Sequence, residues 1–127
     1  RTDVERITIE GKIDPIEVSS RDATTLGILV GEFVTNALKH AFPDGGKGHV
    51  EVALFRNDAG VPTLTVRDTG VGLPEGKEEG GLGSVIIKQL SSQFGGEPIY
   101  TSEPGNGVTV VVAMPALVQA PTHAAAE

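Results

Sequence analysis

The sequence predicts one two-layer α/β sandwich of the α+β class, with helices on one face of a mixed, mostly antiparallel sheet. Three observations support this expectation. The predicted elements follow the order strands, long helix, hairpin, glycine-rich stretch, helix, hairpin. A chain of 127 residues has room for one domain with a substantial core. Strict alternation of strands and helices is absent, so a doubly wound nucleotide fold is not expected.

The first predicted elements are short strands. Residues 4–10 alternate loosely between apolar and polar side chains and predict a strand. Residues 15–18 favour a short second strand. Ser19 or Ser20 is suited to cap the helix that follows, and Asp22 then lies in the first turn, where the helix dipole favours an acid.

The longest predicted helix spans residues 20–41 and organises the rest of the chain. Residues 42–46, Phe-Pro-Asp-Gly-Gly, end it with a helix breaker and two flexible residues. Its apolar residues recur at helical spacing and predict one stripe that faces the core. This stripe comprises Leu26, Leu29, Val30, Phe33, Val34 and Ala37.

The same helix carries a polar edge. Glu32, Asn36 and Lys39 follow one another at i, i+4 and i+7, which stacks a carboxylate, an amide and an ammonium group. Oxygen-bearing side chains suit a hydrated Mg²⁺ ion, and lysine suits a phosphate. The alternative is an ordinary surface helix with a salt bridge. His40, at the end of this helix, is suited to cap it as a cation.

Two hairpins and a second helix complete the predicted fold. Residues 49–56 and 63–67 alternate cleanly on either side of a turn, and residues 99–102 and 108–114 repeat this arrangement. Residues 82–94 have helical spacing, and a pair of glycines ends this helix. Its predicted buried face comprises Leu82, Val85, Ile86 and Leu90.

The charge of the chain argues against nucleic acid as a partner. Seventeen acidic against ten basic residues give a formal net charge of −7, whereas a non-specific nucleic-acid binder needs the opposite sign. No run approaches the ~20 apolar residues of a membrane span, so we expect no membrane contact by this domain. The absence of cysteine removes disulfides and thiolate chemistry. This is compatible with the cytosol, and we expect a cytoplasmic location.

The stretch from Asp68 to Gly83 is rich in glycine and has no periodicity, which is typical of a loop that wraps a ligand. Asp68 follows a predicted strand, with Gly70 and Gly72 behind it. A carboxylate only accepts hydrogen bonds, so it selects a donor such as the exocyclic amine of adenine. The alternative is a solvated aspartate that opens a turn.

A second glycine cluster, residues 80–84, leads directly into a helix. Free N–H groups at a helix start, with glycines that allow a close approach, form a phosphate site. The alternative is a flexible helix entry, since a lone Gly-x-Gly is weak evidence. Thr109 offers a hydroxyl from the last hairpin, but a strand threonine is more often structural. The three histidines lack the spacing of metal ligands.

The chain resembles the Bergerat-fold (GHKL) superfamily, which unites gyrase-type topoisomerases, the heat-shock chaperone ATPase, histidine kinases and mismatch-repair ATPases. The resemblance covers about residues 4 to 115. It rests on three ordered motifs: Glu32-x-x-x-Asn36-Ala-Leu-Lys39-His40, Asp68-x-Gly70-x-Gly72 and Gly81-Leu82-Gly83.

Within this superfamily, residues 32–43 are most similar to sensor histidine kinases with a short ATP lid, related to the HWE kinases. The lid would span about residues 73 to 80. The chain has no Trp, so the signature Trp of the HWE kinases is missing and the HWE subgroup proper is excluded.

The resemblance implies an ATP site with a role for each motif. Asn36 would hold Mg²⁺ and Glu32 would act through the metal's water shell or assist proton transfer, which makes these two the expected catalytic residues. Lys39 or His40 would meet phosphate oxygens. The remaining nucleotide contacts would be Asp68, Gly70 and Gly72 at the adenine and Gly81, Leu82 and Gly83 at the phosphates, with Thr109 as a further candidate.

The resemblance also implies partners outside this chain. The phosphoryl acceptor would be a histidine in a helical dimerisation domain of the parent kinase, and a response regulator would act downstream. Two alternatives stay open: an anti-sigma-type serine/threonine kinase, and a degenerate, non-catalytic docking domain of a phosphotransfer adaptor. We expect residues 1–115 to form the catalytic domain and residues 116–127 to be a disordered tail.

Overall fold

The computed structural model describes residues 6–40, 47–70, 82–102 and 105–117 of the chain. Its helices and strands, in chain order, are β1 (Arg6–Ile13), α1 (Ser20–His40), β2 (Lys47–Arg56), β3 (Pro62–Asp68), α2 (Leu82–Gln93), β4 (Ile99–Ser102) and β5 (Val108–Ala113). Neither of the two helices in these ranges is both long and apolar enough to cross a bilayer.

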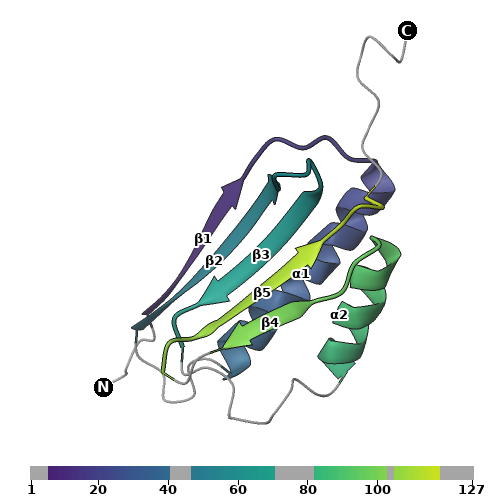
Figure 1. Ribbon diagram of the computed structural model, residues 1–127. Helices are drawn as coiled ribbons and strands as arrows, with labels where there is room; N and C mark the ends of the chain where they lie inside the picture. The colour runs from purple at the N-terminus through teal and green to yellow at the C-terminus, as the bar shows by residue number, and fades with distance from the viewer. Residues whose placement is uncertain (1–5, 41–46, 71–81, 103–104, 118–127) are drawn as a thin grey trace, which may run out of the picture.

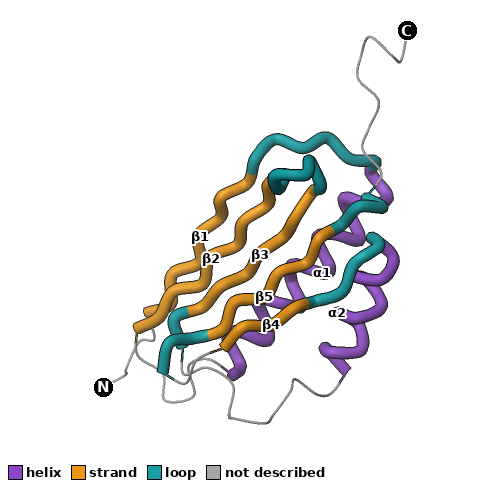
Figure 2. The backbone as a smooth tube through the Cα atoms, in the orientation of Figure 1, coloured by secondary structure: helices purple, strands orange, loops and turns teal. Residues whose placement is uncertain are grey.

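The five strands form one mixed sheet in the order β1-β2-β3-β5-β4. β1 pairs in parallel with β2, and the other three pairings are antiparallel. Both helices lie on the same side of the sheet (Figure 2). The two-layer sandwich with a mostly antiparallel sheet is therefore confirmed.

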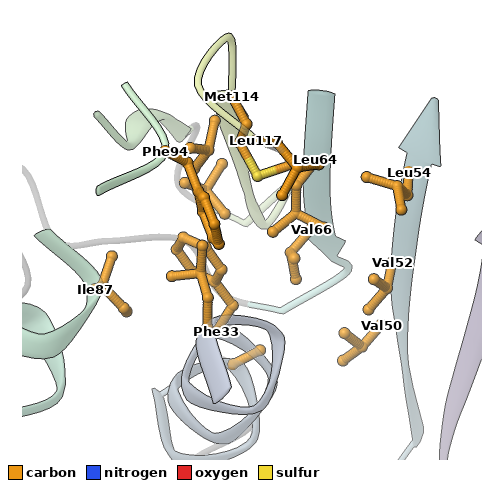
Figure 3. Packing of buried hydrophobic residues seen from close by; sticks show 14 residues of the cluster. Phe33, Val50, Val52, Leu54, Leu64, Val66, Ile87, Phe94, Met114 and Leu117 are labelled. Carbon is orange, nitrogen blue, oxygen red and sulfur yellow. The ribbon is translucent and has the colours of Figure 1, made fainter. Parts of the chain in front are cut away.

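The core lies between the two layers. Alternate residues of β2 point toward the helices, with Val50, Val52 and Leu54 all buried. Phe33 of α1 and Phe94, just beyond α2, meet the strands from the other side (Figure 3). Met114 and Leu117 close the core at one end, where Figure 3 shows them beside Leu64, Phe94 and the end of β5.

Helix α1 begins and packs as its sequence predicts. Ser19 is the cap, because its Oγ accepts the N–H of Asp22 at 3.1 Å. The predicted stripe faces the sheet: Leu29, Phe33 and Ala37 are buried, and Leu26, Val30 and Val34 pack against them. The residues predicted to end the helix, 42–46, lie outside the described residues.

Helix α2 buries a face that differs in part from the predicted one: Leu90 packs against the core as expected, but Val85 does not. Ile87 is fully buried, followed by Ser91 and Phe94, whereas Val85 is 50% exposed. The sequence leaves open which side of this helix faces the core, because Val85, Ile86 and Ile87 are three consecutive apolar residues. Phe94 decides which face of the helix is buried, because residues 87 and 91 lie on the same face as its ring.

Helix α2 ends in a Schellman motif. The N–H groups of Gly95 and Gly96 donate to the carbonyls of Ser92 and Ser91, respectively, and Gly95 has a φ of 85°.

Two other expectations are corrected. Residues 15–18 form no strand; only Val18 makes an isolated β-bridge. The tail was expected to begin at residue 116, but Ala116 donates its N–H to the Phe94 carbonyl at 2.8 Å and Leu117 is only 5% exposed. The packed part of the chain thus extends to Leu117, because Leu117 fills the end of the core. Residues 118–127 lie outside the described ranges.

Candidate functional site

Asp68, the last residue of β3, is the buried acid at one end of the sheet. It is 7% exposed and pairs with Val50 of β2. Its Oδ1 accepts two main-chain hydrogen bonds, from Gly70 at 2.8 Å and from Val108 at 3.2 Å. Two amides therefore fix the orientation of the carboxylate. Within the described residues both bonds fall on Oδ1, so the second oxygen is the one suited to accept from a ligand.

Gly107 is part of the same arrangement. A Cβ at Gly107 would collide with the main-chain carbonyl oxygen of Asp68 and lie 3.1 Å from Oδ1, and its φ is 86°. Only glycine allows β5 to begin this close to the acid. Gly107 and Val108 are not among the residues predicted for the site; the glycine before a predicted strand was the available signal.

The backbone after Asp68 is tied to β2. The N–H of Thr69 donates to the carbonyl of His49 at 3.1 Å, and the N–H of His49 donates to Thr69 Oγ1 at 3.0 Å. Gly70, which follows, is buried. These contacts hold the entry to the glycine-rich stretch against the sheet. Gly72 and the predicted lid lie outside the described residues.

The polar edge of α1 borders the buried stripe. Glu32 and Asn36 are half-buried, and Lys39 is exposed. Asn36 lies four residues before the last residue of α1, about 6 Å along the helix axis. His40 is that last residue, and its side chain is not described. Figure 1 shows that α1 ends at the end of the molecule where β3 ends and β5 begins.

The start of α2 lies at the same end of the molecule (Figure 1). Leu82 and Gly83 are its first two residues, so their N–H groups belong to the first turn, where a helix has free donors. Gly81 is outside the described ranges. The structure thus places Asp68 and Gly70, the C-terminal part of α1 and the N-terminus of α2 at the same end of the molecule, and each of the three motifs belongs to one of these regions.

Thr109 is the predicted residue that the structure places elsewhere. It pairs with Arg67 of β3. Paired residues of antiparallel strands share a face, and neighbouring residues along a strand alternate. Thr109 therefore lies on the face of the sheet away from the helices, whereas Asp68 lies on the helix side. The register between β3 and β5 decides on which face Thr109 lies, and the sequence does not reveal this register.

A family model and individual relatives match this chain. The model described as "Histidine kinase-, DNA gyrase B-, and HSP90-like ATPase" matches residues 21–118. The blue-light-activated histidine kinase 2 of Erythrobacter litoralis is 36% identical over 112 residues, covering 86% of this chain and 32% of that protein. The anti-sigma F factor of Geobacillus stearothermophilus is 30% identical over 118 residues, covering 83% of this chain and 77% of that protein.

A solved structure agrees with the fold described above. The histidine kinase domain of the Erythrobacter litoralis EL346 blue-light activated histidine kinase superposes with a TM-score of 0.78 at 35% identity, covering 87% of this chain and 52% of that one. The chain thus spans between a third and about half of these kinase chains. By the extent of the family match, this chain belongs to the histidine kinase-, DNA gyrase B- and HSP90-like ATPases, the superfamily that its three motifs resemble.

Proposed function

We propose that this chain is the ATP-binding catalytic domain of a sensor histidine kinase. It would transfer the γ-phosphoryl group of ATP to a histidine in a separate helical dimerisation domain. The observation that supports this most is the carboxylate of Asp68, held by two main-chain amides at the end of the molecule where α1 ends and α2 begins. A response regulator would then take the phosphoryl group, and the reaction would occur in the cytoplasm.

In this proposal Asp68 recognises the base. Its carboxylate accepts the exocyclic amine of adenine, and its fixed orientation means that little side-chain entropy is lost on binding. Gly70 and Gly72 allow the backbone to approach the ring closely. Guanine carries an oxygen at the equivalent position, which the same carboxylate would repel. The site would therefore prefer adenine nucleotides.

The edge of α1 and the start of α2 hold the phosphates. Asn36 and Glu32 offer oxygen atoms on a half-buried edge, which fits a hydrated Mg²⁺ ion. The ion would neutralise the charge on the phosphate oxygens. Lys39 and His40 add donors at the end of the helix, and the backbone of Gly81, Leu82 and Gly83 receives phosphate at the helix start. Phosphoryl transfer requires mainly positioning and charge neutralisation, which these groups supply.

The test is phosphotransfer to a separate acceptor. The chain is mixed with labelled ATP, Mg²⁺ and a candidate helical hairpin that carries the acceptor histidine. We expect label on the hairpin that is lost in acid and stable in base, as expected for phosphohistidine. The control is the same hairpin with its histidine changed to glutamine, which must stay unlabelled. Acid-stable label would contradict the proposal.

A serine/threonine kinase is the second candidate, favoured by the 30% identity to an anti-sigma F factor of which this chain covers 77%. The same labelling experiment separates the two, since phosphoserine survives acid. Titration calorimetry with ATP and Mg²⁺ tests the shared premise. No detectable heat of binding would contradict both kinases and favour a non-catalytic docking domain.

A further inference from the structure

A cluster of possible metal ligands lies on the face of the sheet away from the helices. Glu10 of β1 and Glu51 of β2 are direct partners in the parallel pairing, and His49 precedes Glu51 by two residues on the same strand. Side chains alternate along a strand, so His49 and Glu51 share a face with Glu10. This is the face opposite Val50, which is buried under the helices. The cluster is therefore separate from the proposed nucleotide site.

The three side chains are already close enough to share one ion. His49 Nε2 lies 3.3 Å from Glu10 Oε1. One ligand atom from each of Glu10, His49 and Glu51 can be chosen so that all lie within 4.8 Å of one another. Bonds of about 2.0–2.2 Å place neighbouring ligands of a tetrahedral zinc ion roughly 3.3–3.6 Å apart. The His49–Glu10 pair matches this spacing, and the Glu51 ligand atom lies within 4.8 Å of the other two.

Charge explains why the cluster can exist without an ion and still accept one. Two carboxylates directly opposite each other on neighbouring strands repel. Lys12 offsets this repulsion, because its Nζ lies 3.0 Å from Glu51 Oε2. The Lys12 side chain is 63% exposed and can move away freely.

We propose that Glu10, His49 and Glu51 bind one divalent transition-metal ion, with Zn²⁺ the best fit. One imidazole and two carboxylates form a ligand set that zinc accepts, with water in the fourth position. Mg²⁺ requires six oxygen ligands in an octahedron and does not suit an imidazole. This site and the proposed nucleotide site would therefore select different cations. The ion would also fasten edge strand β1 to β2.

The experiment uses the untagged, nucleotide-free chain in a buffer that does not bind metals. Titration calorimetry with zinc chloride should show saturable binding near one ion per chain. His49→Ala and Glu10→Gln should each weaken it by about tenfold or more, since each removes a direct ligand. Lys12→Gln should tighten it, because the competing ammonium is gone. Glu97→Gln, an exposed glutamate outside the cluster, is the matched control and should leave the affinity unchanged.

A second readout does not depend on calorimetry. Zinc that binds only the folded chain raises the free energy of unfolding with its concentration. The rise should occur in the unsubstituted protein and in Glu97→Gln but not in His49→Ala. Cobalt in place of zinc should give the visible absorption of a tetrahedral site. Binding that survives His49→Ala, or zinc uptake that never saturates, would overturn the proposal and identify adventitious metal only.

Discussion

The main chain of Asp68 and the α-carbon of Gly107 are so close that no side chain fits between them. A Cβ at Gly107 would collide with the carbonyl oxygen of Asp68, and the φ of Gly107 is 86°. The next residue, Val108, donates its N–H to the Asp68 carboxylate. The start of β5 therefore lies directly against the acid, and this close approach requires glycine at residue 107.

This contact predicts the effect of Gly107→Ala. The variant should lower the free energy of unfolding by roughly 2–4 kcal/mol. A positive φ costs an alanine about 1–2 kcal/mol, and the collision of its Cβ with main-chain atoms adds to this cost. Urea denaturation measures the free energy of unfolding. Gly105→Ala is the matched control, with a φ of 83° and open space around the added methyl group. Equal losses in the two variants would show that the contact with Asp68 has no energetic consequence.

Asp68→Asn separates the structural role of the acid from its proposed role in binding. The asparagine carbonyl oxygen can still accept from Gly70 and Val108, so the fold should persist. The amide group that replaces the second oxygen cannot accept from adenine. We expect ATP binding to weaken by about 1.5–3 kcal/mol, as for a hydrogen bond to a charged group. Asp68→Ala should lose binding by a similar amount and stability as well. Calorimetry that finds an unchanged dissociation constant in Asp68→Asn would rule out contact with the base.

Asn36→Ala tests the proposed metal role of α1. The variant should slow phosphoryl transfer at least about 100-fold while changing the affinity for ADP without metal by less than about threefold. The expected separation arises because Asn36 would act through Mg²⁺ and not on the base. Transfer rates and calorimetry in the presence of a chelator measure the two quantities. Equal losses in both would contradict a metal ligand at this position.

Ser91→Ala should stabilise the protein. Ser91 is fully buried in α2, and its Oγ has no hydrogen-bond partner within the described residues. Removing an unsatisfied buried hydroxyl and adding a better helix former should raise the free energy of unfolding by about 1 kcal/mol. Ser92→Ala, on the exposed side of the same helix, gains only the propensity difference of roughly 0.5 kcal/mol. Chemical denaturation of both variants checks this, and a less stable Ser91→Ala would show that the hydroxyl has a partner after all.

The ion pair between Lys12 and Glu51 predicts a pH dependence of stability. The hydrogen bond and the charge of Lys12 hold the pKa of Glu51 below its ordinary value, and the same bond raises the pKa of Lys12. A carboxyl whose pKa is lowered on folding contributes stability above its unfolded pKa and loses it as the pH falls. The stability difference between the native protein and Lys12→Met should therefore shrink as the pH falls from about 7 to about 3. The measurement is urea denaturation of both proteins at several pH values. A stability difference between them that stays constant over this pH range would contradict a role for the ion pair.

The strongly periodic parts of the fold follow directly from the sequence. The stripe of α1 repeats over three turns, so burial of Leu29, Phe33 and Ala37 could be predicted from spacing alone. The β2–β3 hairpin alternates cleanly and has a turn between its strands. The place of Asp68 at the end of a strand could also be predicted, because an acid followed by glycines after an alternating run is a local pattern; its contact with adenine stays a prediction.

Features that depend on tertiary contacts could not be predicted in this way. Val108 meets Asp68 across forty residues, and only the assembled sheet brings them together. Thr109 lies on the far face because of the register between β3 and β5. The phase of α2 depends on Phe94, which lies beyond the helix. Each of these outcomes is decided by how the elements pack and not by the composition of any one of them.

The turn between β2 and β3 lies at the opposite end of the strands from Asp68. Its geometry is held by Asn57, whose Oδ1 accepts the N–H groups of Ala59 and Val61, while Asp58 is exposed. The chain has no cysteine, so Asp58→Cys would create one uniquely reactive thiol, separated from the proposed nucleotide site by the length of the sheet. A fluorophore or a surface tether attached there would report on the domain while leaving the proposed ATP site unobstructed.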